Sequence, residues 1–164
     1  MFVKKEKNVL KSFLATVGKR VVIDTGVLYE ILAGTKDGEI FKEMLFQSPE
    51  IIEHWVTDIG FSEIYYLLCR SLKKESFKIV IKEILNLVEI SSITDLNKMA
   101  GQIKCEFPIS LPDCYNIALA EKIQGKALFK HEKEINKALE STNERLDSFI
   151  LFIDDFAYFR ARLK

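Results

Sequence analysis

Residues 21–26, VVIDTG, are the clearest indication of the fold in this sequence. Its first three residues are β-branched and apolar, which predicts a short buried strand of a parallel sheet. Asp24 then falls at the carboxyl end of that strand, where open α/β sheets bind their ligands. A carboxylate at such a place is costly to desolvate unless a cation faces it, which favours a metal ligand. The alternative is a helix N-cap, in which Asp24 or Thr25 accepts hydrogen bonds from the first amides of the next helix.

The composition is that of one globular domain. Of the 164 residues, 48% are hydrophobic and twelve are Phe, so the chain can bury a sizeable core and has no disorder signature. The formal net charge is zero, which argues against a strongly basic surface as the main feature. Residues 1–20 nevertheless hold six basic side chains and one acidic side chain, so they carry +5 and the rest of the chain carries −5. A basic N-terminal segment followed by an acidic remainder suits a metal–carboxylate site with flanking basic residues that attract phosphates, although solvated charge is the commoner explanation.

The cysteines and the hydropathy pattern bear on the compartment. Cys69, Cys105 and Cys114 are odd in number and form no CxxC pair, which predicts reduced, small core residues. No apolar run reaches transmembrane length, and the N-terminus lacks the continuous apolar core of a secretory signal peptide. We therefore expect a cytoplasmic protein with no membrane partner.

Apolar segments and their spacing predict strands that alternate with helices. The predicted strands comprise residues 21–23, 51–56, 88–91, 126–130 and 149–153. The predicted helices comprise residues 27–34, 37–48, 58–73, 75–88, 93–107, 112–125 and 131–142. Ser92 and Asp95 resemble a capping box at the start of one helix. Because no hairpin signature separates the strands, the alternation predicts a parallel sheet with helices on both faces. Residues 1–19 have apolar side chains at helical spacing and predict an amphipathic helix that packs on the body or forms a dimer contact.

Four acids fall where predicted strands end and helices begin. Asp24 ends the first strand, and Glu63 lies in the first half of the helix after the second strand. Asp113 lies in the first turn of a helix opened by Pro112, and Glu132 follows the fourth strand. Four carboxylates at one edge of a parallel sheet would repel one another unless a divalent cation neutralised them. Oxygen-only ligands favour Mg²⁺ or Mn²⁺ over zinc, which prefers His or Cys.

Each acid also has a purely structural explanation. Asp113 and Glu132 could be first-turn residues that the helix dipole favours. Glu63 could be a surface residue that pairs with Arg70, although seven residues is a long separation for such a pair. No single position is persuasive, so the metal-site hypothesis depends on all four acids occurring at the same type of junction.

The order of these motifs resembles the PIN domain family, which includes the VapC-type toxins. The resemblance lies in VVIDTG, TDIGFSEIYYLL and ISLPDCYNIALAEKIQGKAL, and it extends from about residue 20 to residue 153. It implies a three-layer α/β/α sandwich with a central, mainly parallel five-stranded sheet. It also implies a tetrad of acids that binds one or two Mg²⁺ or Mn²⁺ ions and hydrolyses single-stranded RNA. By position, Asp24, Glu63 and Asp113 match the first three family acids. We expect residues 1–19 to be a helical extension and residues 20–164 to be the PIN-like domain, including a C-terminal strand and tail.

Two positions depart from the family pattern. After its fourth strand the family usually has Thr, a small residue and Asp, whereas this chain has Lys130, His131 and Glu132. Two residues after the first acid the family commonly has Ser or Asn, and this chain has Gly26. Glutamate is one methylene longer than aspartate but can still hold a cation, so we expect a weakened tetrad. Thr25 keeps a hydroxyl next to the metal and would bond Asp24 or a metal-bound water.

The hypothesis is a divalent-metal-dependent endoribonuclease that acts on single-stranded RNA, as the toxin of a toxin–antitoxin pair. The basic residues Arg70, Lys73, Lys130 and His131 would contact the RNA backbone, with solvated surface as the alternative. One rival is a PIN-like module that binds RNA or protein without catalysis. A second rival, a haloacid-dehalogenase-like phosphatase, requires a second Asp at the position of Gly26 and is disfavoured.

Two protein partners follow from the same hypothesis. Apolar surface on the N-terminal helix and on the tail, residues 154–164, predicts a homodimer. If the protein is a toxin, an antitoxin would cover the acidic cleft and could insert a basic side chain.

Overall fold

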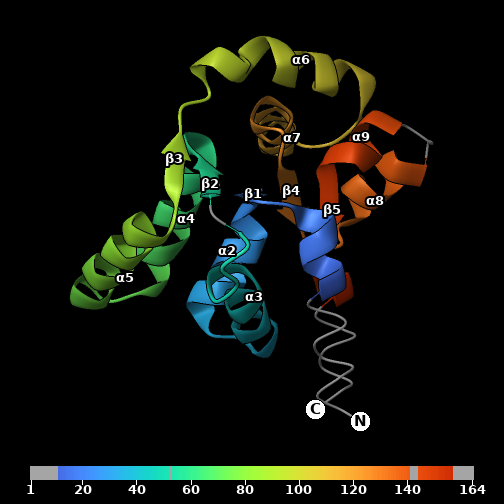
Figure 1. The fold of residues 1–164 in the computed structure, drawn as a ribbon. Coiled ribbons are helices and arrows are strands. Elements are labelled where there is room, and N and C mark those ends of the chain that lie inside the picture. Colours follow the sequence, from blue (N-terminus) through green and yellow to red (C-terminus); the bar gives the residue numbers. More distant parts are fainter. Residues whose placement is uncertain (1–10, 52, 141–143, 157–164) are drawn as a thin grey trace.

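A five-stranded parallel sheet forms the centre of the molecule (Figure 1). The computed structural model describes residues 11–51, 53–140 and 144–156. The strands are β1 (Arg20–Ile23), β2 (Glu53–Thr57), β3 (Glu89–Ser91), β4 (Lys126–Phe129) and β5 (Ile150–Phe152). They lie in the order β3-β2-β1-β4-β5, and every neighbouring pair is parallel. This arrangement confirms the predicted fold class.

The strand order creates a switch point between β1 and β4. From β1 the chain builds the sheet outward through β2 to β3, and then returns to the other side of β1 for β4 and β5. In the register of the sheet, Val22 of β1 pairs with Trp55 of β2 and with Ala127 of β4. The carboxyl ends of β1 and β4 therefore lie next to each other, and open α/β sheets bind ligands in the crevice at such a place.

Helices cover both faces of the sheet and complete three layers (Figure 1). On one face lie α2 (Thr25–Ala33), α3 (Lys36–Phe46), α4 (Asp58–Ser71) and α5 (Lys74–Leu87). On the other lie α6 (Asn97–Glu106), α7 (Leu111–Ile123), α8 (Lys133–Glu140) and α9 (Glu144–Phe149), with a short 3₁₀ turn, η1 (Thr94–Leu96), before α6. The side chains of β1 alternate between the two layers, because Val21 and Ile23 belong to the first core cluster and Val22 to the second.

The described part of the N-terminal segment packs on the body. Residues 11–17 are helical, and Phe13 and Val17 are buried in the first core cluster. The Phe13 ring lies edge-on to Phe156 at 5.2 Å between centroids. Of the two alternatives for this helix, the structure therefore shows packing on the body. The rest of the predicted extension, residues 1–10, and most of the tail, residues 157–164, lie outside the described residues.

Some local predictions were wrong. The helix α9 was not predicted, and Ser92 accepts a hydrogen bond from the Thr94 amide at 3.3 Å instead of forming a capping box with Asp95. Cys69 and Cys105 are exposed, so only Cys114 is a core residue, although all three are free thiols. Within the described residues, no helix is long and apolar enough to cross a membrane.

Candidate metal centre

The four predicted acids line one pocket beside the switch point. The pocket has a volume of about 460 Å³ and lies against the start of α2, the middle of α4 and the start of α7. The carboxylates in its lining are Asp24, Glu63, Asp113, Glu132 and Glu134. Strand order, which brings the ends of β1 and β4 together, explains why acids up to 110 positions apart in the sequence share one pocket.

Asp24 is both a helix cap and a pocket residue. Its Oδ2 accepts a hydrogen bond from the Gly26 amide at 2.8 Å, and Asp24 is the N-cap of α2. Its side chain also lines the pocket, where the residue is only 7% exposed. The two alternatives that the sequence left open are therefore compatible, since the cap holds one carboxylate oxygen while the carboxylate faces the other acids.

A buried chain of hydrogen bonds fixes the other oxygen of Asp24. The Asn116 side-chain amide donates to Asp24 Oδ1 at 3.0 Å, and the Thr57 hydroxyl donates to Asn116 Oδ1 at 3.1 Å. Thr57 in turn accepts from the Gly60 amide at 3.2 Å and caps α4. These hydrogen bonds join the start of α2 to β2, α4 and α7. Sequence reasoning missed Asn116, whose position three residues after Asp113 places it on the same face of α7.

Thr25 orients Glu63. The Thr25 hydroxyl donates to Glu63 Oε2 at 2.8 Å, which ties α2 to α4 across the pocket. The sequence predicted that this hydroxyl would bond Asp24 or a metal-bound water, so its direct partner differs from the prediction. The hydroxyl still supports an acid of the pocket, because it restricts the rotamer of the long Glu63 side chain.

Asp113 is held in the first turn of α7. Ser110 is the N-cap, and its hydroxyl accepts from the Asp113 amide at 3.2 Å. Pro112 stands in the first turn, where its missing N–H has no helical partner to lose. Asp113 is 9% exposed, and burial raises the pKa of its carboxyl, with smaller contributions from the charges of Glu63 and Glu134.

The segment after β4 contributes two acids, Glu132 just before α8 and Glu134 in the first turn of α8. Burial raises the pKa of Glu132, and the charges of Asp113 and Glu134 raise it further. Glu132 Oε1 would lie 3.7 Å from a Cβ placed on Gly26, and Asp24 Oδ2 would lie 3.2 Å from it. Gly26 therefore leaves space for the longer glutamate beside Asp24. Glu134 is a pocket residue that the sequence did not single out, because it appears there as an ordinary charged helix start.

The pocket is strongly electronegative at its base. Burial, together with the charges of Asp113 and Glu132, raises the pKa of Asp24 from 3.8 to about 7, against the hydrogen bonds from the Gly26 and Thr25 amides that lower it. A cluster of carboxylates that pushes one of its members toward neutrality is a place where a divalent cation is stabilised.

A comparison with protein-family models assigns the chain. The model described as PIN domain matches residues 21–139, which include all five pocket acids. This chain belongs to the PIN domain family. At the level of the family, it is therefore related to nucleases, which hydrolyse phosphodiester bonds. A comparison with curated proteins finds no match.

Solved structures share the fold of this PIN domain at low sequence identity. The VapBC2 complex from Rickettsia felis, bound to a promoter DNA fragment, has a TM-score of 0.61 and 16% identity, covering 81% of this chain and 98% of that chain. A toxin–antitoxin complex from Klebsiella pneumoniae has a TM-score of 0.57 and 16% identity, covering 70% and 89%. Mycobacterium tuberculosis VapC20, described as a sarcin-ricin loop cleaving toxin, has a TM-score of 0.56 and 18% identity, covering 72% and 94%.

The donor set of this PIN domain fits Mg²⁺ or Mn²⁺, because the pocket offers carboxylate oxygens from four segments of the chain. The carboxylates are not tightly gathered. Among the described residues, three ligand atoms within 4.8 Å of one another occur instead at His131, Asp154 and Asp155. There both His131 ring nitrogens already have hydrogen-bond partners, since they face oxygens of Asn136 and Asp155 at 3.0 and 2.7 Å.

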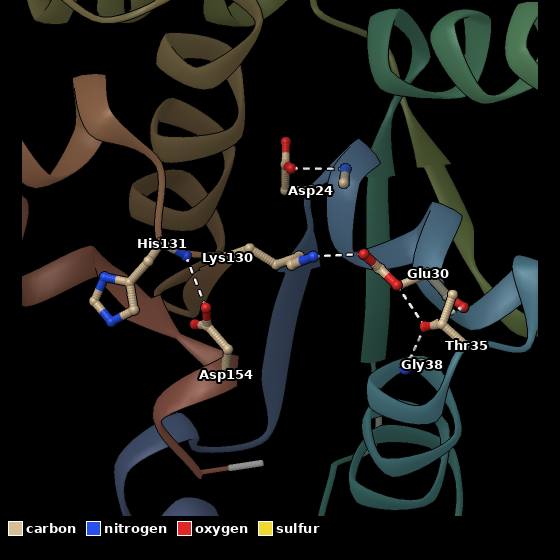
Figure 2. Close-up of polar contacts among 8 residues, drawn as sticks. Asp24, Glu30, Thr35, Gly38, Lys130, His131 and Asp154 are labelled. Carbon is tan, nitrogen blue, oxygen red and sulfur yellow. Dashed lines mark hydrogen bonds and ion pairs between the residues drawn. The ribbon is translucent and has the colours of Figure 1, made fainter. Parts of the chain in front are cut away.

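The predicted RNA-contacting residues lie outside the pocket lining. Figure 2 shows Lys130 extending to Glu30, with which it forms an ion pair, while the His131 ring is turned away from Asp24. The backbone amide of His131 donates to Asp154, and its ring stacks on Phe152 at 4.0 Å. Arg70 bonds the hydroxyl of Tyr66, a pocket residue, and Lys73 is the N-cap of α5. Of the four, Arg70 therefore has the most direct connection to the pocket.

Proposed function

We propose that this PIN domain is a divalent-metal-dependent endoribonuclease that hydrolyses phosphodiester bonds in single-stranded RNA. The observation that supports this most is the shared pocket of Asp24, Glu63, Asp113 and Glu132 at the switch point of the sheet. The raised pKa of Asp24 adds to it, since a carboxylate cluster of this kind is stabilised by a cation.

The residues of the pocket would have distinct roles. Asp24, Glu63 and Asp113 would hold one Mg²⁺ or Mn²⁺, and Glu132 would hold a second ion or orient water. The metal neutralises charge on the phosphate and lowers the pKa of bound water, which is its usual contribution to phosphodiester hydrolysis.

The remaining contacts pre-organise these ligands. Asn116 fixes Asp24 through the Thr57–Asn116 chain, and Thr25 fixes Glu63. Such supporting hydrogen bonds hold metal ligands in orientation and raise affinity. Arg70, near the end of α4, and Lys73, just after it, would attract the RNA backbone electrostatically. Lys130 and His131 are more remote from the pocket.

The test is cleavage of a labelled single-stranded RNA by purified protein in Mn²⁺. We expect Asp24→Asn and Asp113→Asn to abolish cleavage, whereas the exposed control Asp147→Asn should leave it unchanged. Equal cleavage by wild type and both pocket variants would show that these carboxylates do not carry the reaction.

The second candidate is a binding module without catalysis. It is motivated by Glu132 in place of the family aspartate and by the loose grouping of the pocket acids. The two candidates differ in metal binding, because only a metal site gives Mn²⁺-dependent thermal stabilisation. Absence of that stabilisation, with RNA binding retained, would favour the module.

A toxin role with an antitoxin partner is the proposed biological setting. Its support is the fold shared with a structure described as a toxin–antitoxin complex and with VapC20, which is described as a toxin. In this setting a small partner protein would cover the acidic pocket, and the chain would form a homodimer. Growth arrest on expression, relieved by co-expression of a small neighbouring gene, would test the pairing.

A further inference from the structure

An exposed aromatic ring lines the carboxylate pocket. Tyr66 is 51% exposed, yet it borders the pocket together with Glu63 and Leu67 of the same helix. Its position three residues after Glu63 places both side chains on one face of α4. A large aromatic side chain left half in water beside a charged pocket can supply an apolar face to a ligand in that pocket.

Arg70, one turn further along α4, contacts the same ring. Its Nη1 donates to the Tyr66 hydroxyl, and its guanidinium carbon lies 5.2 Å from the ring centroid. This distance is within the range of a cation–π contact. Glu63, Tyr66 and Arg70 therefore form a stripe at positions i, i+3 and i+7, which at 1.5 Å per residue spans roughly 10 Å along the helix.

The neighbouring Tyr65 has a different environment. It is 47% exposed, but its ring packs edge-on against Phe77 at 4.8 Å and lies 6.4 Å from Phe61. Tyr65 thus joins α4 to α5. Among the described residues, no aromatic ring packs on Tyr66, whose ring contact is with Arg70. Two adjacent tyrosines of similar exposure therefore differ in that only Tyr66 faces the pocket.

We propose that Tyr66 is a stacking platform for a base of single-stranded RNA and that Arg70 contacts the adjacent phosphate. The inference rests on the proposed function in one respect, because the carboxylate pocket would take the scissile phosphate. A base next to that phosphate would lie on the ring, one turn along α4. Stacking on an aromatic face accepts any base, and a guanidinium binds phosphate oxygens in a planar geometry. Tyr66 is accordingly a substrate-binding residue that sets affinity for unpaired RNA.

The binding test uses a 5′-fluorescein-labelled uridine 12-mer RNA and an abasic 12-mer with the same ribose-phosphate backbone. Anisotropy is measured on ice in Ca²⁺, a cation that oxygen ligands also bind, and a gel checks that the RNA is intact. We expect Tyr66→Ala to weaken binding of the uridine 12-mer about tenfold or more, as removal of one stacking contact does. Tyr66→Phe keeps the ring and should bind within about twofold of wild type. Tyr65→Ala is the matched control on the same helix and should also bind within about twofold.

The abasic 12-mer separates stacking from charge. Tyr66→Ala should leave its affinity unchanged, whereas Arg70→Ala should weaken both oligomers, because the phosphates are present in each. In steady-state cleavage, Tyr66→Ala should raise KM with little change in kcat, as expected for uniform binding. Circular dichroism and thermal unfolding establish that each variant is folded.

The outcomes distinguish this inference from the proposed function. If wild type cleaves RNA and Tyr66→Ala binds and cleaves like wild type, the stacking platform is refuted and the nuclease stands. If wild type binds RNA in a Tyr66-dependent way without cleaving it, the platform stands and the nuclease fails. Equal losses for Tyr66→Ala and Tyr65→Ala, or for Tyr66→Ala and Tyr66→Phe, would also overturn the platform. The platform would also be refuted if Tyr66→Ala weakened binding of a protein partner but left RNA affinity unchanged.

Discussion

Replacing Asp24 with Asn should stabilise the metal-free protein at pH 8 and destabilise it at pH 4. Burial and the charges of Asp113 and Glu132 raise the pKa of Asp24 from 3.8 to about 7. Because the folded pKa lies above the unfolded one, this group favours folding below pH 4, and the advantage is lost as pH rises through about 7. Above pH 7 the wild type therefore carries a buried, repelled charge that the amide of the variant lacks.

The magnitude follows from the same values. A pKa moved from 3.8 to about 7 corresponds to about 4 kcal/mol against the ionised form. The pocket is open to water, and screening reduces this figure, to about 2 kcal/mol. The Gly26 amide and the Asn116 amide donate to different oxygens of Asp24, and asparagine replaces one of these oxygens with an NH2 donor, so one hydrogen bond is lost at a cost of about 1 kcal/mol. The net expectation is a gain of roughly 1 kcal/mol at pH 8 and a loss of about 1 kcal/mol at pH 4.

Urea unfolding in EDTA at pH 4, 6 and 8 measures this difference directly. Asp147→Asn, an exposed acid in α9, is the control and should show no such trend. Mn²⁺ should reverse the order at pH 8, because saturation at 100 times the dissociation constant adds about 2.7 kcal/mol to wild type and little to Asp24→Asn. A variant that is less stable than wild type by the same amount at every pH would refute the electrostatic reasoning.

Three further predictions concern the scaffold and the surroundings of the pocket. A Cβ on Gly125 would lie 2.4 Å from the Arg20 carbonyl oxygen, so Gly125→Ala should lower the free energy of unfolding by about 2 kcal/mol or more. Gly101→Ala in α6 has nothing within 4 Å of the new Cβ, so it should raise the free energy of unfolding by about 0.5–1 kcal/mol. A loss of similar size in both variants, measured by urea unfolding, would contradict the steric argument. Asn116→Ala removes the side-chain amide that donates to Asp24, so we expect the free energy of unfolding to fall by about 1–3 kcal/mol and Mn²⁺ binding, measured by calorimetry, to weaken. An unchanged Mn²⁺ affinity would count against the positioning role of Asn116. Lys130→Met breaks the ion pair with Glu30 and should cost less than about 1 kcal/mol; RNA cleavage should stay within twofold of wild type, and a tenfold loss would show that Lys130 contacts the substrate.

Local patterns predicted the elements well where the physical cause is local. The apolar run at residues 21–23 became β1, and its following acid became the N-cap of α2. Prediction failed where tertiary contacts override local preference. The helix α9 is six residues long and packs Leu146 into the second core cluster, so its stability comes from burial and not from its own periodicity. The helix α7 ends on Gln124 in the left-handed region, with φ 53°, one residue before the glycine expected to close it.

In the candidate site, too, sequence position predicted some of the pocket residues and missed others. Sequence position was enough to choose Asp24, Glu63, Asp113 and Glu132, because the carboxyl ends of parallel strands meet at one edge whatever the side chains are. It could not identify Glu134 or Asn116 as their neighbours. Neither spacing nor composition reports which side chains will meet across helices that pack together only in the folded chain.

The sequence alone was enough to predict an α/β fold with acids at strand-to-helix junctions, the first of which is Asp24 in VVIDTG. The folded structure was needed to show that Asp24 is both a helix cap and a pocket residue, that its pKa rises to about 7, and that Lys130 is directed to Glu30. The physical reason is that desolvation and Coulomb interaction depend on distances between segments far apart in the chain. The strand order β3-β2-β1-β4-β5 places the ends of β1 and β4 next to each other, and this placement sets the distances between the pocket acids.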